Sequence, residues 1–254
     1  MLSIEFIGAS CIGKTHFLKE FYGACGPGNK WDTHLNVLRK INSVDPAFYK
    51  LVQQIIRRIT GKSFSKNKRK SALFEAYSDD IEPIIDVFIN SQHIGQDLAW
   101  QKIRLFDYFV NSILYQCLWI QDKIADDIIV LFDEGIVHNG GLFSILDNPD
   151  RFSGILTSSI FPKAVVHFEI DNKLYRKRIY ERFQKFGERK INSLNRNISD
   201  DSIDDFMNRS KAHAEKSLLA CKILNIPVLE LNAESSEENF KKLKHLIMQI
   251  SEKG

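Results

Sequence analysis

Eight consecutive residues near the amino terminus have the types and spacing of a loop that binds phosphate. Residues 8–15 read Gly-Ala-Ser-Cys-Ile-Gly-Lys-Thr, a match to the phosphate-binding loop of nucleotide-binding proteins. Gly8 and Gly13 permit backbone dihedrals and a close approach that a Cβ would obstruct. The backbone N–H groups and the following helix amino terminus can then face phosphate oxygens. The pattern predicts that this segment binds a nucleoside triphosphate.

Each position in the loop has an expected contact. Lys14 supplies a mobile cation for the terminal phosphates, and the Thr15 hydroxyl is placed to ligate Mg²⁺. The alternative is a glycine-rich turn between a strand and a helix that binds no ligand. The residues predicted to surround the nucleotide are Gly8, Ala9, Ser10, Cys11, Ile12, Gly13, Lys14 and Thr15.

Cys11 has two interpretations of its own. A helix amino terminus lowers the pKa of a thiol, which would suit a redox switch. The simpler interpretation is a small residue that fits the loop.

A second acidic position follows a strongly apolar segment. Residues 128–132 read Ile-Ile-Val-Leu-Phe, which is typical of a parallel strand covered on both faces. In a phosphate-loop fold the end of such a strand carries a second Mg²⁺ contact, usually through water, so Thr15 and Asp133 are the predicted metal residues. Glu134 either orients an attacking water or belongs to the acceptor site of a kinase. His138 either touches a substrate or is an ordinary loop histidine.

A basic helix is predicted over residues 172–189. At 100° per residue, Arg178, Arg182 and Arg189 fall within about 40° of one another. Guanidinium groups are suited to the charge that spreads over a phosphoryl group during transfer. The alternative is a solvated basic helix face.

Apolar segments at residues 2–7, 128–132, 164–170 and 227–231 predict strands, separated by helical patterns. Strands that alternate with helices favour an α/β fold in three layers, a parallel sheet covered by helices on both faces. Residues 33–123 read as mostly helical and form a helical insertion within one domain, residues 1–254; its clearest helix is expected at 97–121. The basic segment 61–70 is interpreted as an exposed loop, or as a segment that binds an anionic partner.

The composition is that of an ordinary globular protein. Of the 254 residues, 44% are hydrophobic and 26% charged, and the net charge is +3, too small to indicate nucleic acid as a partner. The four cysteines are scattered and show no zinc spacing, so a reduced, cytoplasmic protein is expected. Neither a signal peptide nor a membrane-spanning segment is expected.

The order of these parts resembles the P-loop nucleoside and nucleotide kinases, with the deoxynucleoside kinase and thymidylate kinase branches most similar. The resemblance covers about residues 1–24 and 126–254, and the phosphate-binding loop is its strongest motif. It implies that Arg178 and Arg182 are lid or sensor arginines in a lid region at 171–200. It also implies that Asn232-Ala233-Glu234 lies near the adenine.

The chain departs from that family in two places. The family commonly has Asp-Arg or Glu-Arg after the second acidic strand, whereas this chain has Asp133-Glu134-Gly135. The family also has a strand after the first helix that ends in an acid on the acceptor side. The nearest equivalent here is Asp32, a candidate general base, with no convincing strand before it.

The expected function is a kinase that transfers the γ-phosphoryl group of Mg-ATP to a hydroxyl or phosphate of a nucleoside, nucleotide or sugar. The expected catalytic residues are Lys14, Asp133, Glu134, Arg178, Arg182 and Asp32. The alternative is an ATPase or nucleotide switch that acts on a macromolecular partner, with Glu134 activating water; a sulfuryl transferase is a third. The sequence leaves open the identity of the acceptor and the choice between ATP and GTP. It also leaves open whether Asp32 or Glu134 is the base and whether the protein forms a homodimer.

Overall fold

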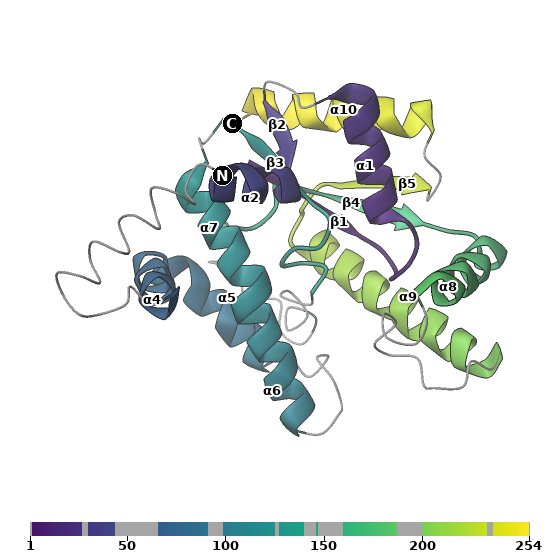
Figure 1. Cartoon of the computed structure of the whole chain (residues 1–254), viewed down its shortest axis with the longest axis horizontal. Helices are drawn as coiled ribbons and strands as arrows, with labels where there is room; N and C mark the ends of the chain where they lie inside the picture. The colour runs from purple at the N-terminus through teal and green to yellow at the C-terminus, as the bar shows by residue number, and fades with distance from the viewer. Residues whose placement is uncertain are drawn as a thin grey trace.

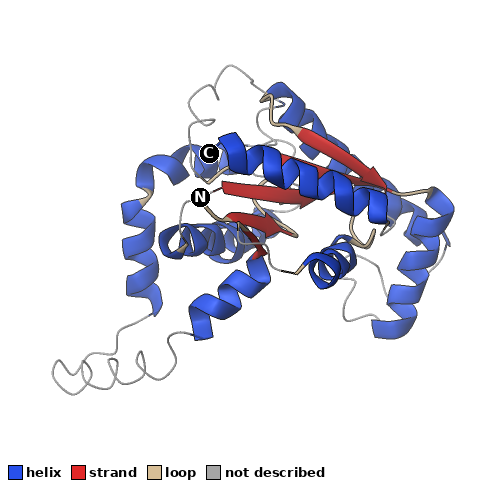
Figure 2. Ribbon diagram, turned by 90° about the horizontal axis from the view of Figure 1, so that it is seen from above, coloured by secondary structure: helices blue, strands red, loops and turns tan. Residues whose placement is uncertain are grey.

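One parallel sheet organises the chain. The computed structural model describes residues 2–26, 30–43, 66–90, 99–124, 127–139, 146, 160–186, 200–232 and 236–253. Within them, five strands lie side by side in the order β2-β3-β1-β4-β5, all parallel (Figures 1 and 2). The strands are β1 (Leu2–Ile7), β2 (Trp31–Thr33), β3 (Ile129–Phe132), β4 (Ala164–Glu169) and β5 (Val228–Asn232).

Helices connect the strands and cover the sheet. They are α1 (Lys14–Cys25), α2 (His34–Ser43), α4 (Lys66–Ala76), α5 (Ser78–Asn90), α6 (Ala99–Tyr108), the π-helical segment η1 (Phe109–Leu114), α7 (Tyr115–Lys123), α8 (Asn172–Phe186), α9 (Asp200–Ile223) and α10 (Glu237–Lys253). In the part of the chain that the structure describes, no helix is both long and apolar enough to cross a membrane.

Two hydrophobic cores lie on opposite faces of the sheet. Successive side chains of a strand point to opposite faces, so Ile4 and Phe6 of β1 pack toward α1 and α10. Val130 and Phe132 of β3 pack on the other face, against α7 and its neighbours. Figure 1 shows α1 and α10 on one side of the strands and α9 on the other. This three-layer arrangement confirms the predicted α/β class.

The strand order places a binding position at the carboxyl end of β1. The chain leaves β1 toward β2 in one direction along the sheet, whereas β3 connects to β4 in the opposite direction. In open α/β sheets, ligands bind outside the carboxyl ends of the strands where the direction of connection reverses. The loop that follows β1 lies at that position.

The four predicted strands correspond to β1, β3, β4 and β5, whereas β2 corrects the sequence analysis. Trp31–Thr33 forms a short edge strand, with Trp31 paired to Ile129 and Thr33 to Leu131. A three-residue strand shows no periodicity of its own. It forms because β3 supplies its hydrogen bonds and because the Trp31 ring packs on Phe21, with ring centroids 4.9 Å apart.

The helical region requires two further corrections. Within the segment expected to be a basic loop, residues 66–70 form the start of α4, and residues 61–65 lie outside the described residues. The long helix expected at 97–121 is helical from Ala99 to Lys123, but η1 interrupts its α-helical pattern. In η1, Phe109 stacks on Phe88 of α5 at a centroid distance of 4.2 Å.

Phe17 of α1 is the centre of the aromatic core on the α1 and α10 face. It is 2% exposed and makes edge contacts with Phe168 of β4 at 5.0 Å and Phe240 of α10 at 5.3 Å. We predict that Phe17→Ala lowers the free energy of unfolding by about 3–5 kcal/mol, because it leaves a cavity between α1, α10 and the sheet. Urea unfolding followed by circular dichroism measures this loss. Phe17→Leu is the control and should lose less; equal losses would contradict the cavity explanation.

Candidate functional site

The loop between β1 and α1 has the backbone conformation that its glycines require. We call residues 8–15 the glycine loop. Gly8 and Gly13 have φ angles of 139° and 107°, which side-chain-bearing residues rarely adopt. A Cβ at Gly8 would also lie 3.0 Å from the carbonyl oxygen of Phe168 on β4. The glycines therefore allow the loop to lie tightly against the neighbouring strand.

Lys14 begins α1 and lies over the glycine loop. Its side chain is buried, and Nζ donates a hydrogen bond to the Gly8 carbonyl at 3.2 Å. Burial lowers the pKa of Lys14, while the nearby carboxylates of Glu134 and Asp133 act in the opposite direction. The structure thus places a desolvated amine inside the loop, next to two acidic groups.

Thr15 and Asp133 are in direct contact although they are far apart in sequence. The Thr15 hydroxyl donates a hydrogen bond of 2.5 Å to Oδ2 of Asp133. Oδ1 of Asp133 is buried and has no hydrogen-bond partner among the described residues. The backbone N–H of Asp133 donates to Nδ1 of His34 at 3.4 Å, and the His34 ring stacks on Phe132. The two residues predicted to hold a metal are therefore brought together.

Two arginines of α8 contact the glycine loop. Arg178 donates a hydrogen bond to the Ile12 carbonyl, and Arg182 donates to Sγ of Cys11 at 3.3 Å. Arg189 lies outside the described residues, so only Arg178 and Arg182 of the three predicted arginines can be placed. Of the residues expected near the adenine, Asn232 ends β5, and 233–234 lie outside the described residues.

Hydrogen bonds at the start of α8 fix the direction from which these arginines approach. Asp171 caps the helix, and its Oδ1 accepts the N–H groups of Lys173 at 2.8 Å and Leu174 at 3.2 Å. Such a cap satisfies backbone donors that have no partner within the helix. Arg176, on the side of α8 that meets α9, donates hydrogen bonds to Asp200 and Asp204 of α9. Arg178 and Arg182 are the arginines that contact the loop.

The environment of Cys11 argues against the redox switch considered from the sequence. Burial raises the pKa of the Cys11 thiol, although the Arg182 guanidinium beside it favours the thiolate. Cys11 has a φ of 70°, a backbone conformation that few residues other than glycine adopt.

A buried carboxylate that the sequence analysis missed supports the turn after β3. Glu5 of β1 accepts hydrogen bonds from the N–H groups of Gly135 at 3.1 Å, Val137 at 3.0 Å and His138 at 2.5 Å. A Cβ at Gly135 would lie 2.6 Å from Oε2 of Glu5. The glycine that departs from the kinase family pattern is therefore required by Glu5. Glutamate within an apolar strand was the available signal in the sequence.

Glu134 lies beside Asp133 and faces the cations of the loop. Burial raises the pKa of Glu134, and the charge of Lys14 opposes this increase. His138 lies 3.6 Å from the Glu134 carboxylate through Nε2, and burial holds the pKa of His138 well below its ordinary value. His138 is thus a neutral, buried residue of the turn, and His213 of α9 hydrogen-bonds to its carbonyl.

Asp32 lies on β2, where its oxygens are fully engaged. Lys40 of α2 forms an ion pair with Oδ2 at 2.7 Å. Oδ1 accepts the N–H of Thr33 at 2.7 Å and the side-chain amide of Asn36 at 3.3 Å. These contacts hold the first turns of α2 against the edge of the sheet, which is a positioning role.

A pocket of about 230 Å³ opens between α1 and α2 beside Thr15 and Asp133. Its lining combines two cations and the Asp133 carboxylate with neutral polar, aromatic and aliphatic groups, and Asp32 is not part of it. The lining residues are Thr15, Leu18, Lys19, Tyr22, Thr33, His34, Leu35, Asn36, Arg39 and Asp133. The sequence analysis named only two of them, because the other side chains are ordinary residues of α1, β2 and α2.

No protein-family model matches this chain, and no curated protein does. The chemistry of the site is therefore inferred from its residues and their geometry. Together they form a tight glycine-rich turn with three cations, adjoining a hydroxyl and two carboxylates. Such a site suits an anionic ligand that carries a hard cation.

We predict that Gly135→Ala destabilises the fold by about 1–3 kcal/mol, because the added methyl group would overlap the buried Glu5 carboxylate. Urea unfolding measures the change. Gly23→Ala is the matched control, since a Cβ there meets nothing within 4 Å and alanine favours the middle of a helix. A loss at Gly135 no larger than that at Gly23 would show that Glu5 does not hold this turn.

Glu5 also predicts a pH dependence of stability. Burial raises its pKa from the ordinary 4.5 to about 7 in the folded chain. Between these values the unfolded chain has released the proton and the folded chain retains it, so the free energy of unfolding falls as pH rises. We predict that Glu5→Gln removes this contribution. Urea unfolding of both proteins from pH 4.5 to pH 8 tests it, and a difference independent of pH would contradict it.

Proposed function

We propose that the chain is a P-loop phosphotransferase that passes the γ-phosphoryl group of Mg-ATP to a small acceptor. One observation carries the proposal: Arg178 and Arg182 of α8 reach the same loop that Lys14 covers. Charge that spreads over a phosphoryl group during transfer is stabilised by such positioned cations. Because both arginines belong to this chain, stabilising the charge on the phosphoryl group would not require an arginine from a second protein.

The residues next to the loop fit a magnesium ion. Mg²⁺ binds oxygen ligands and usually keeps several waters, with one or two carboxylates from the protein. The Thr15 hydroxyl and Asp133 offer these oxygens, and Oδ1 of Asp133 is buried without a hydrogen-bond partner among the described residues. A bound Mg²⁺ would neutralise phosphate charge and satisfy this oxygen.

The loop and its cations would orient the triphosphate. The glycine loop offers backbone N–H groups to the phosphates, and the Lys14 ammonium would exchange the Gly8 carbonyl for phosphate oxygens. Arg178 and Arg182 would exchange their contacts with Ile12 and Cys11 in the same way. These exchanges replace neutral acceptors by charged ones, which form stronger hydrogen bonds.

The pocket between α1 and α2 is the proposed acceptor site. It borders Thr15 and Asp133, and its volume of about 230 Å³ suits a small molecule. Lys19 and Arg39 in its lining favour an acceptor that carries negative charge. Glu134 is the better candidate for the general base, because its side chain is half exposed and its carboxylate interacts with Lys14 and Asp133 at the loop. Asp32 is occupied by Lys40.

Glu134 also supports a second candidate function. Its carboxylate interacts with Lys14 and Asp133, a position from which it could orient a water toward a γ-phosphate. In that case the chain is an ATPase whose hydrolysis responds to a macromolecular partner.

Measuring ADP formation separates the two functions. Wild-type protein with Mg-ATP should form ADP only when the correct nucleoside, nucleotide or sugar is added, and Lys14→Ala should abolish this activity. Arg182→Gln should lower kcat on the order of 10²–10³-fold, because one stabilising donor is lost. Arg209→Gln, an exposed arginine of α9 that pairs with Asp205, is the matched control and should keep full activity.

Two results would overturn the kinase. Steady acceptor-free hydrolysis that Glu134→Gln strongly reduces would establish the ATPase instead. Failure of Mg-ATP to bind in calorimetry would exclude both functions.

A further inference from the structure

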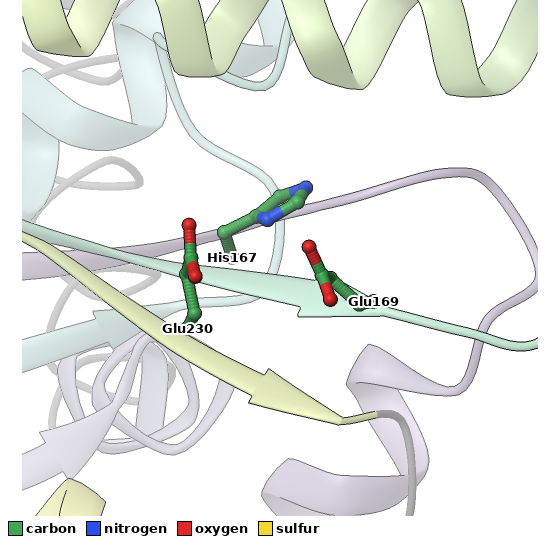
Figure 3. Close-up of side chains that lie close together, drawn as sticks. All are labelled: His167, Glu169 and Glu230. Carbon is green, nitrogen blue, oxygen red and sulfur yellow. The ribbon is translucent and has the colours of Figure 1, made fainter.

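Three side chains that offer metal ligands converge on the face of the sheet that α9 covers. His167 and Glu169 belong to β4, and Glu230 belongs to β5. Because side chains alternate along a strand, residues 167 and 169 point to the same face. The register of the parallel pair places Glu230 directly opposite His167. Figure 3 shows the imidazole between the two carboxylates.

The three groups are close enough to share one ion. One ligating atom from each residue lies within 4.8 Å of the others. Ligands bound to a Zn²⁺ ion at about 2.0–2.2 Å lie somewhat closer together than this. Glu169 and Glu230 are exposed, so rotation of their side chains can close the difference without moving the strands.

His167 supplies an independent sign of a ligand. Its side chain is only 8% exposed, and Nδ1 is buried with no hydrogen-bond partner among the described residues. A buried nitrogen without a partner carries a desolvation cost. In Figure 3 the ring presents a nitrogen to both carboxylates, and coordination of a metal ion there would remove that cost.

We infer that His167, Glu169 and Glu230 bind a divalent transition-metal ion of the Zn²⁺ class. An imidazole nitrogen with two carboxylate oxygens is a donor set that Zn²⁺ accepts, and three protein ligands leave room for water. The ion would tie β5, which lies at one edge of the described sheet, to β4. The site uses none of the residues proposed to hold Mg-ATP, so this proposal does not depend on the proposed function.

Titration of the full chain with Co²⁺ and Zn²⁺ tests this site, after treatment with a chelator and without nucleotide. Wild-type protein should bind one ion with an absorption spectrum that lacks thiolate charge-transfer bands. His167→Asn, Glu169→Gln and Glu230→Gln should each weaken binding about 10–100-fold or more. His245→Asn, which alters an exposed histidine of α10, is the matched control and should bind like wild type.

Thermal unfolding gives a second measurement. A ligand that binds only the folded chain raises Tm, so Zn²⁺ should raise the Tm of wild type and of His245→Asn but not that of His167→Asn. Absence of Co²⁺ and Zn²⁺ binding in wild type would overturn the proposal. Binding that all three variants retain would also overturn it, because the ion would then lie elsewhere on the chain.

Discussion

The site depends on the hydrogen bonds that the buried Glu5 side chain accepts. It accepts three backbone N–H groups from the turn after β3 and thereby fixes this turn to the central strand β1. Asp133 and Glu134 lie between β3 and those hydrogen bonds, so Glu5 determines where they stand relative to Lys14 and Thr15. Gly135 is the glycine that lets this carboxylate fit. Glu5 is not itself predicted to contact a bound ligand, but it positions Asp133 and Glu134, which are.

Arg178 and Arg182 of the site are held in place by contacts on the opposite side of α8. Arg176 pairs with Asp200 and Asp204, and the Tyr180 hydroxyl donates to Asp200 at 2.6 Å. These contacts fasten α8 to α9 and leave Arg178 and Arg182 directed at the glycine loop. Exposed ion pairs of this kind contribute little stability individually; their effect here is orientation. The positive loop and the acidic turn face each other, a charge pattern suited to a metal–phosphate ligand.

Strand β4 contributes to both proposed sites through its two faces. Phe168 packs on Phe6 and Phe17 and brings its carbonyl against Gly8, which supports the glycine loop. Its neighbours His167 and Glu169 point to the other face, where Glu230 of β5 joins them. The period of two along a strand therefore separates a phosphate-type site from a metal-type cluster within a few residues. Because β5 lies at an edge of the sheet, an ion bound at the proposed second site would tie it to β4.

The sequence by itself determined the features that depend on local pattern. Four of the five strands, the glycine loop between β1 and α1, and the acidic pair after β3 all follow from periodicity and residue type over a few neighbours. Only the tertiary structure decided what those residues touch. The Thr15–Asp133 contact, the pairing of Asp32 with Lys40 and the fit of Glu5 against Gly135 join segments far apart along the chain or depend on the packing of neighbouring elements. Strand register and helix packing set such contacts, and no local pattern records them. The glycine loop was therefore visible in the sequence, whereas the residues around it became a site only through the fold.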